Sequence, residues 1–305
     1  MEARIDIAIN QLYKGQDEAR FFKIPTSKSE IDDGWDAETE IAVILDGHGY
    51  DFFMDEFRKL DLPTHFLNEN PIESIQKNID EQQRINNIDY IIASKSGSTI
   101  SFVTVKKNLK KGIYRVHCEW LGDSPIYIYK NRNLVFQSEI HRASKIGELE
   151  ELRKMNVLSG KQETVHMKTF QIIDKNTMED ILKLYICLRG NYCLECTRSL
   201  GHKRLVRLDP QIYNCDFLIK DSIRIVLCTD GVADIVNLKK IKEDSDLFEN
   251  ASASEIVKYA ENRWNQEWNT KIWDNNTKSY KNSIQNFDSN ERDDCACITW
   301  ELYTF

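Results

Sequence analysis

This chain has few of the residues that mark non-globular or membrane proteins. Only 5 prolines and 12 glycines occur among its 305 residues, which excludes a collagen-like or low-complexity architecture. No apolar run approaches the roughly 20 residues that a membrane-spanning helix needs. Acids at Glu2 and Asp6 fall where a signal peptide has its apolar core. We therefore expect an intracellular protein, cytoplasmic or nuclear, without membrane association.

The chain also has fewer basic than acidic residues and lacks the paired cysteine motifs of a zinc site. The chain has 41 Lys and Arg residues against 49 Asp and Glu residues, a formal net charge of −8. A nucleic-acid-binding protein needs a basic face to displace counterions, so we expect no nucleic-acid partner. The 8 cysteines fit buried intracellular thiols, and the CxxC pair of Cys193 and Cys196 lacks the second pair of a zinc knuckle. Such an acidic chain is instead suited to holding cations through carboxylates.

Short β-type runs with helices between them make up most of the chain. The expected strands cover residues 5–9, 21–25, 41–45, 100–105, 114–121, 125–129, 134–136, 223–229 and 295–300. The expected helices cover residues 50–60, 71–79, 147–155, 178–188 and a stretch capped by Ser252 and Glu255. This succession of strands indicates an antiparallel sheet. The polar segment at 268–290 is expected to be a long loop, and the lack of a clear linker favours one domain over residues 1–305.

The sequence Asp46-Gly47-His48-Gly49 directly follows the apolar run at 41–45. Burying a carboxylate at a strand end is costly unless a cation meets it. The two glycines let the backbone turn sharply and approach a ligand closely. A metal or phosphate site at this strand end is therefore the first hypothesis.

Asp123, Asp230 and Asp293 share the context of Asp46, because each lies at the edge of an apolar β-type run. One such acid alone is more often a turn residue, since Asp-Gly and Gly-Asp are ordinary turn dipeptides. Four of them in an acidic chain instead suggest a shared site for Mg²⁺ or Mn²⁺, which prefer carboxylate and carbonyl oxygens. An unrelated acidic domain that uses these pairs only as turns remains the alternative.

These motifs, in this order, resemble those of the metal-dependent serine/threonine protein phosphatases of type 2C. Residues 46–49 are similar to the DGHGG signature, 96–99 to SGST, 121–124 to the GDS strand end, 139–141 to the DH that follows it, 197–202 to SRALGD, 228–236 to ASDGLWDVV and 292–297 to RDNxTVxVV. The resemblance extends from about Asn10 to the C-terminus. It implies an α+β fold in which two packed antiparallel sheets are flanked by helices (αββα), with metals between the sheets at one end.

The resemblance also implies roles for individual residues. Asp46 would bridge two Mn²⁺ or Mg²⁺ ions, the Gly47 carbonyl would bind one of them, and Asp230 and Asp293 would complete the pair. Two further roles concern Asp123 and Asp234, which would hold a weaker third ion, and His48, which would protonate the leaving oxygen as a general acid. Asp17 takes the place of an acid near the N-terminus that belongs to the same metal site.

The chain departs from the family at two places near the expected site. The phosphate-binding arginine of the family falls near Leu12, so we expect Lys14 to bind phosphate as a point charge, with Arg4 or Arg20 as alternatives. The region at about 154–180, which corresponds to the family's flap, diverges. The implied enzyme is a phosphoprotein phosphatase that hydrolyses phosphoserine and phosphothreonine as a monomer. The alternative is a pseudophosphatase that keeps the fold and metal site but binds phosphoproteins or a kinase.

Overall fold

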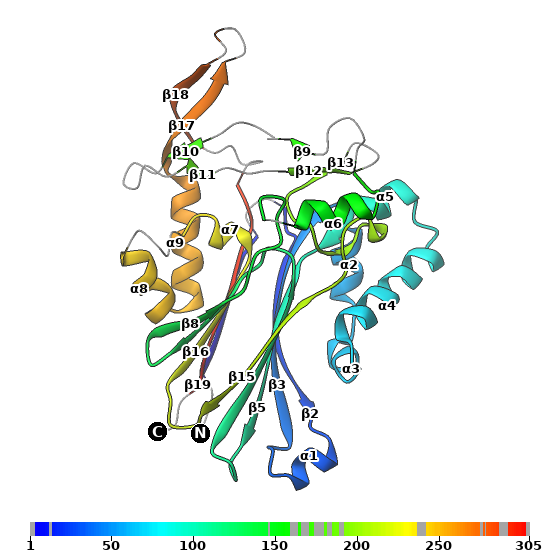
Figure 1. Cartoon of the computed structure of the whole chain (residues 1–305), viewed down its shortest axis with the longest axis vertical. Coiled ribbons are helices and arrows are strands. Elements are labelled where there is room, and N and C mark those ends of the chain that lie inside the picture. Colours follow the sequence, from blue (N-terminus) through cyan, green and yellow to red (C-terminus); the bar gives the residue numbers. More distant parts are fainter. Residues whose placement is uncertain are drawn as a thin grey trace.

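The computed structural model describes residues 4–11, 14–145, 147–158, 164–165, 171–173, 180–181, 185–188, 192–236, 242–274, 277, 279–286 and 292–302. Two antiparallel sheets stand face to face at its centre, and helices cover the outer face of each sheet (Figure 1). This arrangement confirms the predicted α+β sandwich of two sheets flanked by helices. None of the helices in the described ranges combines the length and the apolar character that crossing a membrane would require.

The first sheet has five strands in the order β1-β19-β16-β7-β8. Their bounds are β1 Arg4–Asn10, β7 Ile126–Lys130, β8 Asn133–Gln137, β16 Ile223–Cys228 and β19 Cys295–Leu302. All residues of β16 are buried, which explains why its sequence is apolar at every position except Arg224 and does not alternate. The Arg224 guanidinium donates to the carbonyl of Phe248 at 2.8 Å and to Glu301 at 2.6 Å.

The second sheet has seven strands, ordered β14-β4-β3-β5-β6-β15 with β2 paired to β3. Their bounds are β2 Asp17–Pro25, β3 Glu38–Gly49, β4 Ser96–Ser98, β5 Ile100–Asn108, β6 Ile113–Leu121, β14 Leu200–Gly201 and β15 Gln211–Leu218. Successive residues of β3 point to opposite faces. Ala42 and Ile44 enter the core between the sheets, and Val43 and Leu45 pack against helices on the outer face.

Helices cover the second sheet on one side and the first sheet on the other (Figure 1). Helices α2 (Phe52–Arg58), α3 (Leu62–Phe66) and α4 (Pro71–Ile85) pack against β3 and β5. Helix α9 (Ala253–Asn265), which begins with the predicted Ser252–Glu255 capping box, packs against the first sheet beside α8 (Lys242–Asn250). The shorter helical elements are α1 Lys28–Asp32, α5 Tyr90–Ser94, α6 Glu148–Lys154, α7 Asp230–Ala233 and the 3₁₀ turn η1 His202–Arg204.

The helix predicted over 178–188 is wrong in its described part. Strands β11 (Asp180–Ile181) and β12 (Tyr185–Leu188) lie there, and β12 pairs with both β13 (Tyr192–Leu194) and β9 (Thr164–Val165). Ile186 and Leu188 are both buried. A short apolar run satisfies either period, and here the cross-strand pairing decides between them. Residues 177–179 and 182–184, and most of the proposed flap at 154–180, lie outside the described residues.

The loop predicted over 268–290 is also wrong in its described part. Strands β17 (Glu267–Asp274) and β18 (Ser279–Asn286) form an antiparallel hairpin, which a further strand, β10 (Gln171–Ile173), extends. The hairpin projects from one end of the molecule (Figure 1). Trp268 at its base is buried, whereas the rest of the segment is mostly polar in sequence. Backbone hydrogen bonds form such a ladder without apolar alternation, so hydrophobic periodicity carries no signal for it.

Candidate metal centre

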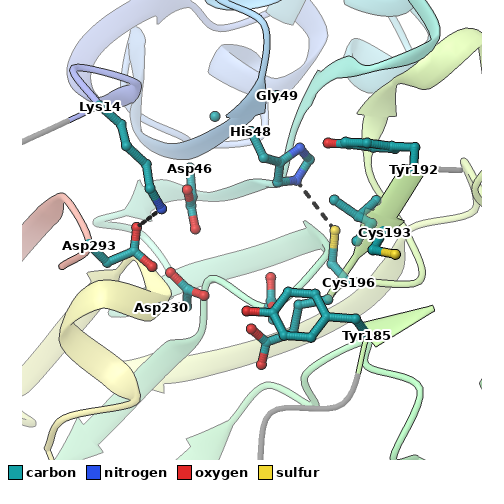
Figure 2. A pocket seen from close by; sticks show the side chains of 14 residues that line it. Lys14, Asp46, His48, Gly49, Tyr185, Tyr192, Cys193, Cys196, Asp230 and Asp293 are labelled. Atoms are coloured by element: carbon teal, nitrogen blue, oxygen red, sulfur yellow. Dashed lines mark hydrogen bonds and ion pairs between the residues drawn. The ribbon is translucent and has the colours of Figure 1, made fainter. Parts of the chain in front are cut away.

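The acids that the sequence singled out come together at one end of the sandwich. Each acid lies at or near one end of a different strand. Asp17 begins β2, Asp46 lies near the end of β3, and Asp123 follows β6. Asp230 begins α7 after β16, and Asp293 precedes β19. A cleft of about 230 Å³ opens there, lined by Lys14, Asp46, His48, Asp123, Asp230 and Asp293 among others. Figure 2 shows the carboxylates of Asp46, Asp230 and Asp293 turned toward one another.

Strand register explains why acids so far apart in sequence meet. Asp17 lies directly opposite Asp46 in the β2–β3 ladder. Cys228 pairs with Cys297 at the end of the β16–β19 ladder, so Asp230 and Asp293 both leave the first sheet at that end. Thr229 strengthens the junction, because its hydroxyl donates to Oδ2 of Asp17 at 2.8 Å and accepts from the amide of Ala296 at 3.0 Å.

Negative charge is concentrated at this end of the molecule. Burial raises the pKa of Asp46 well above its usual range, and the nearby Asp230, Asp17 and Asp293 raise it further. Burial and Asp293 likewise raise the pKa of Asp17, although the hydrogen bond from Thr229 opposes the shift. A divalent cation would remove this repulsion by binding the charged forms.

The residues present fit a hard divalent cation. The donors that face the cleft are mainly carboxylate oxygens, which Mn²⁺ and Mg²⁺ prefer and which differ from the Cys and His set of structural zinc. Gly47 supports the fit, because a Cβ at this position would lie 2.5 Å from Cγ of Met54 and 2.8 Å from the carbonyl oxygen of Gln16. Only glycine lets this strand end pack so closely beside the cleft.

Of the three cations that the sequence offered for phosphate binding, Lys14 is the one that lies at these acids. Its Nζ donates to Oδ1 of Asp293 at 2.5 Å (Figure 2). Asp294, which sequence reasoning did not separate from Asp293, fixes the segment by accepting from the amides of Lys14 at 3.2 Å and Gln16 at 2.9 Å. Leu12 lies outside the described residues.

The other two candidate cations lie elsewhere. Arg20 pairs with Glu18 at 3.0 Å and donates to the carbonyl of Arg58 at 3.2 Å. Arg4 lies opposite Glu301 in the β1–β19 ladder, at the far end of the strand from Asn10 and therefore about 20 Å from the acids.

His48 belongs to a buried chain of hydrogen bonds. Its Nδ1 lies 3.0 Å from Nε2 of His202, whose Nδ1 lies 3.1 Å from the carbonyl oxygen of Ser94. Because that carbonyl only accepts, His202 donates from Nδ1 and accepts from Nδ1–H of His48. Nε2 of His48 then accepts from the thiol of Cys196 at 3.3 Å. Burial, followed by the charges of His202 and Lys14, lowers the pKa of His48, so this arrangement describes a neutral imidazole.

Asp123 and Asp234, the acids expected to hold a third ion, lie around a guanidinium. Nε of Arg142 donates to Asp123 at 2.7 Å, and its Nη1 donates to Asp234 at 2.9 Å. Nη2 lies 3.4 Å from Asp230, and Nη1 lies 3.2 Å from Glu195. Sequence reasoning missed both Arg142 and Glu195. The available signal was the position of Arg142, which directly follows the segment at 139–141 that was already aligned with the family.

Residues of β12 and β13, and the two residues after β13, form the other wall of the cleft. They are Tyr185, Tyr192, Cys193, Leu194, Glu195 and Cys196. The ring of Tyr192 lies 5.5 Å from that of His202, centroid to centroid. Sequence reasoning did not assign these residues to the site, because they lie near the region that diverges from the family.

The fold and the acidic cleft define the class of this protein. Residues 37–243 match the family model of protein phosphatase 2C, whose members are metal-dependent serine/threonine protein phosphatases. The chain belongs to this family. A comparison with curated protein sequences finds no match.

Solved structures with the same fold include distant relatives. The serine-threonine phosphatase 2C from Toxoplasma gondii shares 13% identity over 98% of this chain and 94% of its own, with a TM-score of 0.56. A sex determining protein of C. elegans shares 16% identity over 99% of this chain, with a TM-score of 0.50. This chain covers 65% of the length of the C. elegans protein. At such identities the likeness shows the fold alone.

Proposed function

We propose that this chain is an active protein phosphatase that hydrolyses phosphoserine and phosphothreonine with the help of two Mn²⁺ or Mg²⁺ ions. The observation that carries the proposal is the convergence of Asp46, Asp230 and Asp293 on one cleft at the end of the sandwich. Asp46, the Gly47 carbonyl, Asp230 and Asp293 would hold the two ions, with Asp46 shared between them. Asp17 supports Asp46 from the opposite strand.

When bound, the two cations would lower the pKa of the attacking water and offset charge on the phosphoryl oxygens. The residues of the chain orient the substrate and move protons. Lys14 leaves Asp293 and meets the phosphate as a point charge. His48, once protonated at Nε2, donates to the leaving Ser or Thr oxygen. His202 positions the ring of His48 for this transfer through the 3.0 Å contact between their nitrogens.

A cysteine nucleophile is the chemical alternative for a phosphatase with thiols at its cleft. Burial raises the pKa of the Cys196 thiol, and the nearby Asp123 and Asp46 raise it further. The thiolate is the reactive form, so a thiol held neutral by its surroundings is a poor nucleophile. Direct attack by water, without a covalent enzyme intermediate, fits these surroundings better.

A phosphatase assay titrated with Mn²⁺ tests the proposal. The wild type should hydrolyse a phosphoserine or phosphothreonine peptide only with added Mn²⁺ or Mg²⁺, and EDTA should abolish turnover. Asp230→Asn should lose turnover while keeping the fold. Asp216→Asn serves as the matched control, because this acid lies on β15 and pairs with Arg115 at 3.0 Å. Full activity of Asp230→Asn, or of the EDTA-treated protein, would reject the metal mechanism.

The second candidate is a pseudophosphatase that binds phosphoproteins or a kinase without turnover. It is favoured by the 2.5 Å pairing of Lys14 with Asp293, because this contact keeps the candidate phosphate-binding cation on a proposed metal ligand. Calorimetry that detects metal binding, together with no turnover on any phosphopeptide, would support this candidate over the enzyme.

A further inference from the structure

One guanidinium lies among four carboxylates beside the proposed two-metal centre. Arg142 contacts Asp123 at 2.7 Å, Asp234 at 2.9 Å and 3.1 Å, Glu195 at 3.2 Å and Asp230 at 3.4 Å. Nε, Nη1 and Nη2 each contact a carboxylate oxygen, so all three nitrogens of the planar guanidinium are engaged in the cluster. These acids come from three separate parts of the chain, and Arg142 is the cation that joins them.

The cluster is largely removed from water. The Arg142 side chain is 13% exposed, and that of Asp123 is 4% exposed. Burial acts against the positive charge, but the surrounding Asp234, Asp123, Glu195 and Asp230 raise the pKa of Arg142 well above its usual range. The guanidinium is therefore a permanent positive charge at every pH where the protein is folded.

The backbone holds Arg142 in this place from both sides. The amide of the preceding His141 donates to the carbonyl of Gly122 at 3.0 Å, and the His141 carbonyl accepts from the amide of Thr197 at 2.8 Å. The Gly122 amide in turn donates to Nδ1 of His141 at 3.0 Å. Arg142 itself forms an antiparallel bridge with Cys196. The guanidinium enters the cluster from a fixed backbone and not from a loose surface loop.

A third divalent ion bound by Asp123 and Asp234 would compete with the guanidinium for the same carboxylates. Displacing the side chain would strand a largely buried charge without its partners, which is strongly unfavourable. We propose that Arg142 is a resident cation that takes the place of a third divalent ion, so that the centre holds two ions. This inference rests on the proposed function for those two ions.

Asp230 links the resident cation to the metal centre. It belongs to the acids around Asp46 and also lies 3.4 Å from Nη2 of Arg142. Arg142 is thus a positioning residue that orients a proposed metal ligand. Through Glu195 it also ties the wall of the cleft to that ligand.

Counting bound Mn²⁺ by equilibrium dialysis and calorimetry tests the inference without relying on turnover. The wild type should bind two ions per chain. Asp234→Asn should leave that count unchanged, because its carboxylate meets the guanidinium and not an ion. Arg142→Ala should gain a weaker third ion, and Arg142→Ala combined with Asp234→Asn should lose it again. Arg142→Lys, which keeps a positive charge, should retain the count of two.

Each outcome separates the inference from the proposed function. Three ions in an active wild type, falling to two in Asp234→Asn, would overturn the resident cation and leave the phosphatase intact. No bound Mn²⁺ in the wild type would overturn both. The wild-type and Asp234→Asn counts decide the question even if Arg142→Ala does not fold, which thermal unfolding would reveal.

Discussion

The ammonium of Lys14 lies 2.5 Å from Oδ1 of Asp293, across 279 positions of the chain. Burial acts against the charge of Lys14, but the carboxylates of Asp293, Asp46 and Asp230 outweigh it and raise its pKa. In the proposed mechanism Asp293 also binds a metal ion. One carboxylate would then have two competing positive partners, and Lys14 would link metal loading to phosphate binding.

Lys14→Gln should move two kinetic parameters in opposite directions. The concentration of Mn²⁺ that gives half-maximal activity should fall, because the ammonium no longer competes for Asp293. KM for a phosphopeptide should rise by about tenfold, the loss expected for one hydrogen bond to a charged group. Lys14→Arg should keep KM at the wild-type value or lower it, because a guanidinium can bind the phosphate through two parallel hydrogen bonds. Steady-state kinetics over a Mn²⁺ series measures both parameters.

Lys258→Gln is the matched control for this substitution, because it removes an exposed ammonium from α9, away from the cleft. It should change neither parameter. If Lys14→Gln shifted KM and the Mn²⁺ requirement in the same direction, the competition between ammonium and metal would be refuted.

Removing the metal should lower the thermal stability of the wild type and have little effect on Asp46→Asn. An ion at about 100 times its dissociation constant adds about 2.7 kcal/mol to the free energy of unfolding. Asp46→Asn should lose most of this gain, since Asp46 is the proposed bridge between the ions. Differential scanning calorimetry with Mn²⁺ and with EDTA measures the difference. Asp216→Asn should keep the full gain, and an equal gain in Asp46→Asn would place the ion elsewhere.

The sheets and the acids could be predicted because each depends on a local pattern. Leu45 ends an apolar run, so the carboxylate of Asp46 is expected where the buried part of the strand stops. Asp123 and Asp230 likewise follow the apolar runs of their strands. The hairpin of β17 and β18 gave no such signal, because backbone hydrogen bonds pair mostly polar strands without any apolar period.

Arg142 illustrates what local patterns cannot predict. It lies in an irregular segment between β8 and α6, where no apolar period assigns a direction to its side chain. Its partners Asp123, Glu195 and Asp234 come from distant parts of the chain. The resemblance to the phosphatase family assigned Asp123 and Asp234 to an ion. Carboxylates attract any cation, and the guanidinium becomes visible only once the segments are placed together.

The imidazole pair of His48 and His202 should make the metal-free protein sensitive to acid. Burial lowers the pKa of His202 to about 4, whereas an unfolded histidine titrates near 6.5. The unfolded state thus binds more protons between these values, and stability is lost as the pH falls from about 6.5 to about 4. His202→Gln keeps a donor for Ser94 and an acceptor for His48 and removes this loss. Its stability should therefore fall less steeply than that of the wild type over this range.

Urea unfolding in EDTA between pH 7 and pH 4 measures this difference, which should approach about 3 kcal/mol at the acid end. His117→Gln is a control of opposite sign. The hydrogen bond that His117 donates to the carboxylate of Glu119 raises the pKa of His117 despite partial burial. The contribution of His117 to stability is therefore present at acid pH and is lost as the pH rises through the raised value. Parallel pH profiles for the wild type and His202→Gln would contradict the assignment of a buried neutral pair.

Gly231→Ala tests how tightly the strand ends that carry Asp230 and Asp293 are packed. A Cβ at Gly231 would lie 2.0 Å from the carbonyl oxygen of Asp294 and 3.1 Å from Cβ of Asp293. The Gly231 carbonyl also accepts from the indole of Trp264 at 2.6 Å, so helix α9 resists any shift. The substitution should cost about 1–3 kcal/mol of stability and weaken Mn²⁺ binding, because the two acids are forced apart. Gly112→Ala, where no other atom lies within 4 Å, should carry only the backbone cost of its positive φ and leave the Mn²⁺ affinity unchanged. If Gly231→Ala lost stability to the same extent as Gly112→Ala and bound Mn²⁺ like the wild type, the spacing of these acids would not depend on the contact between the two strand ends.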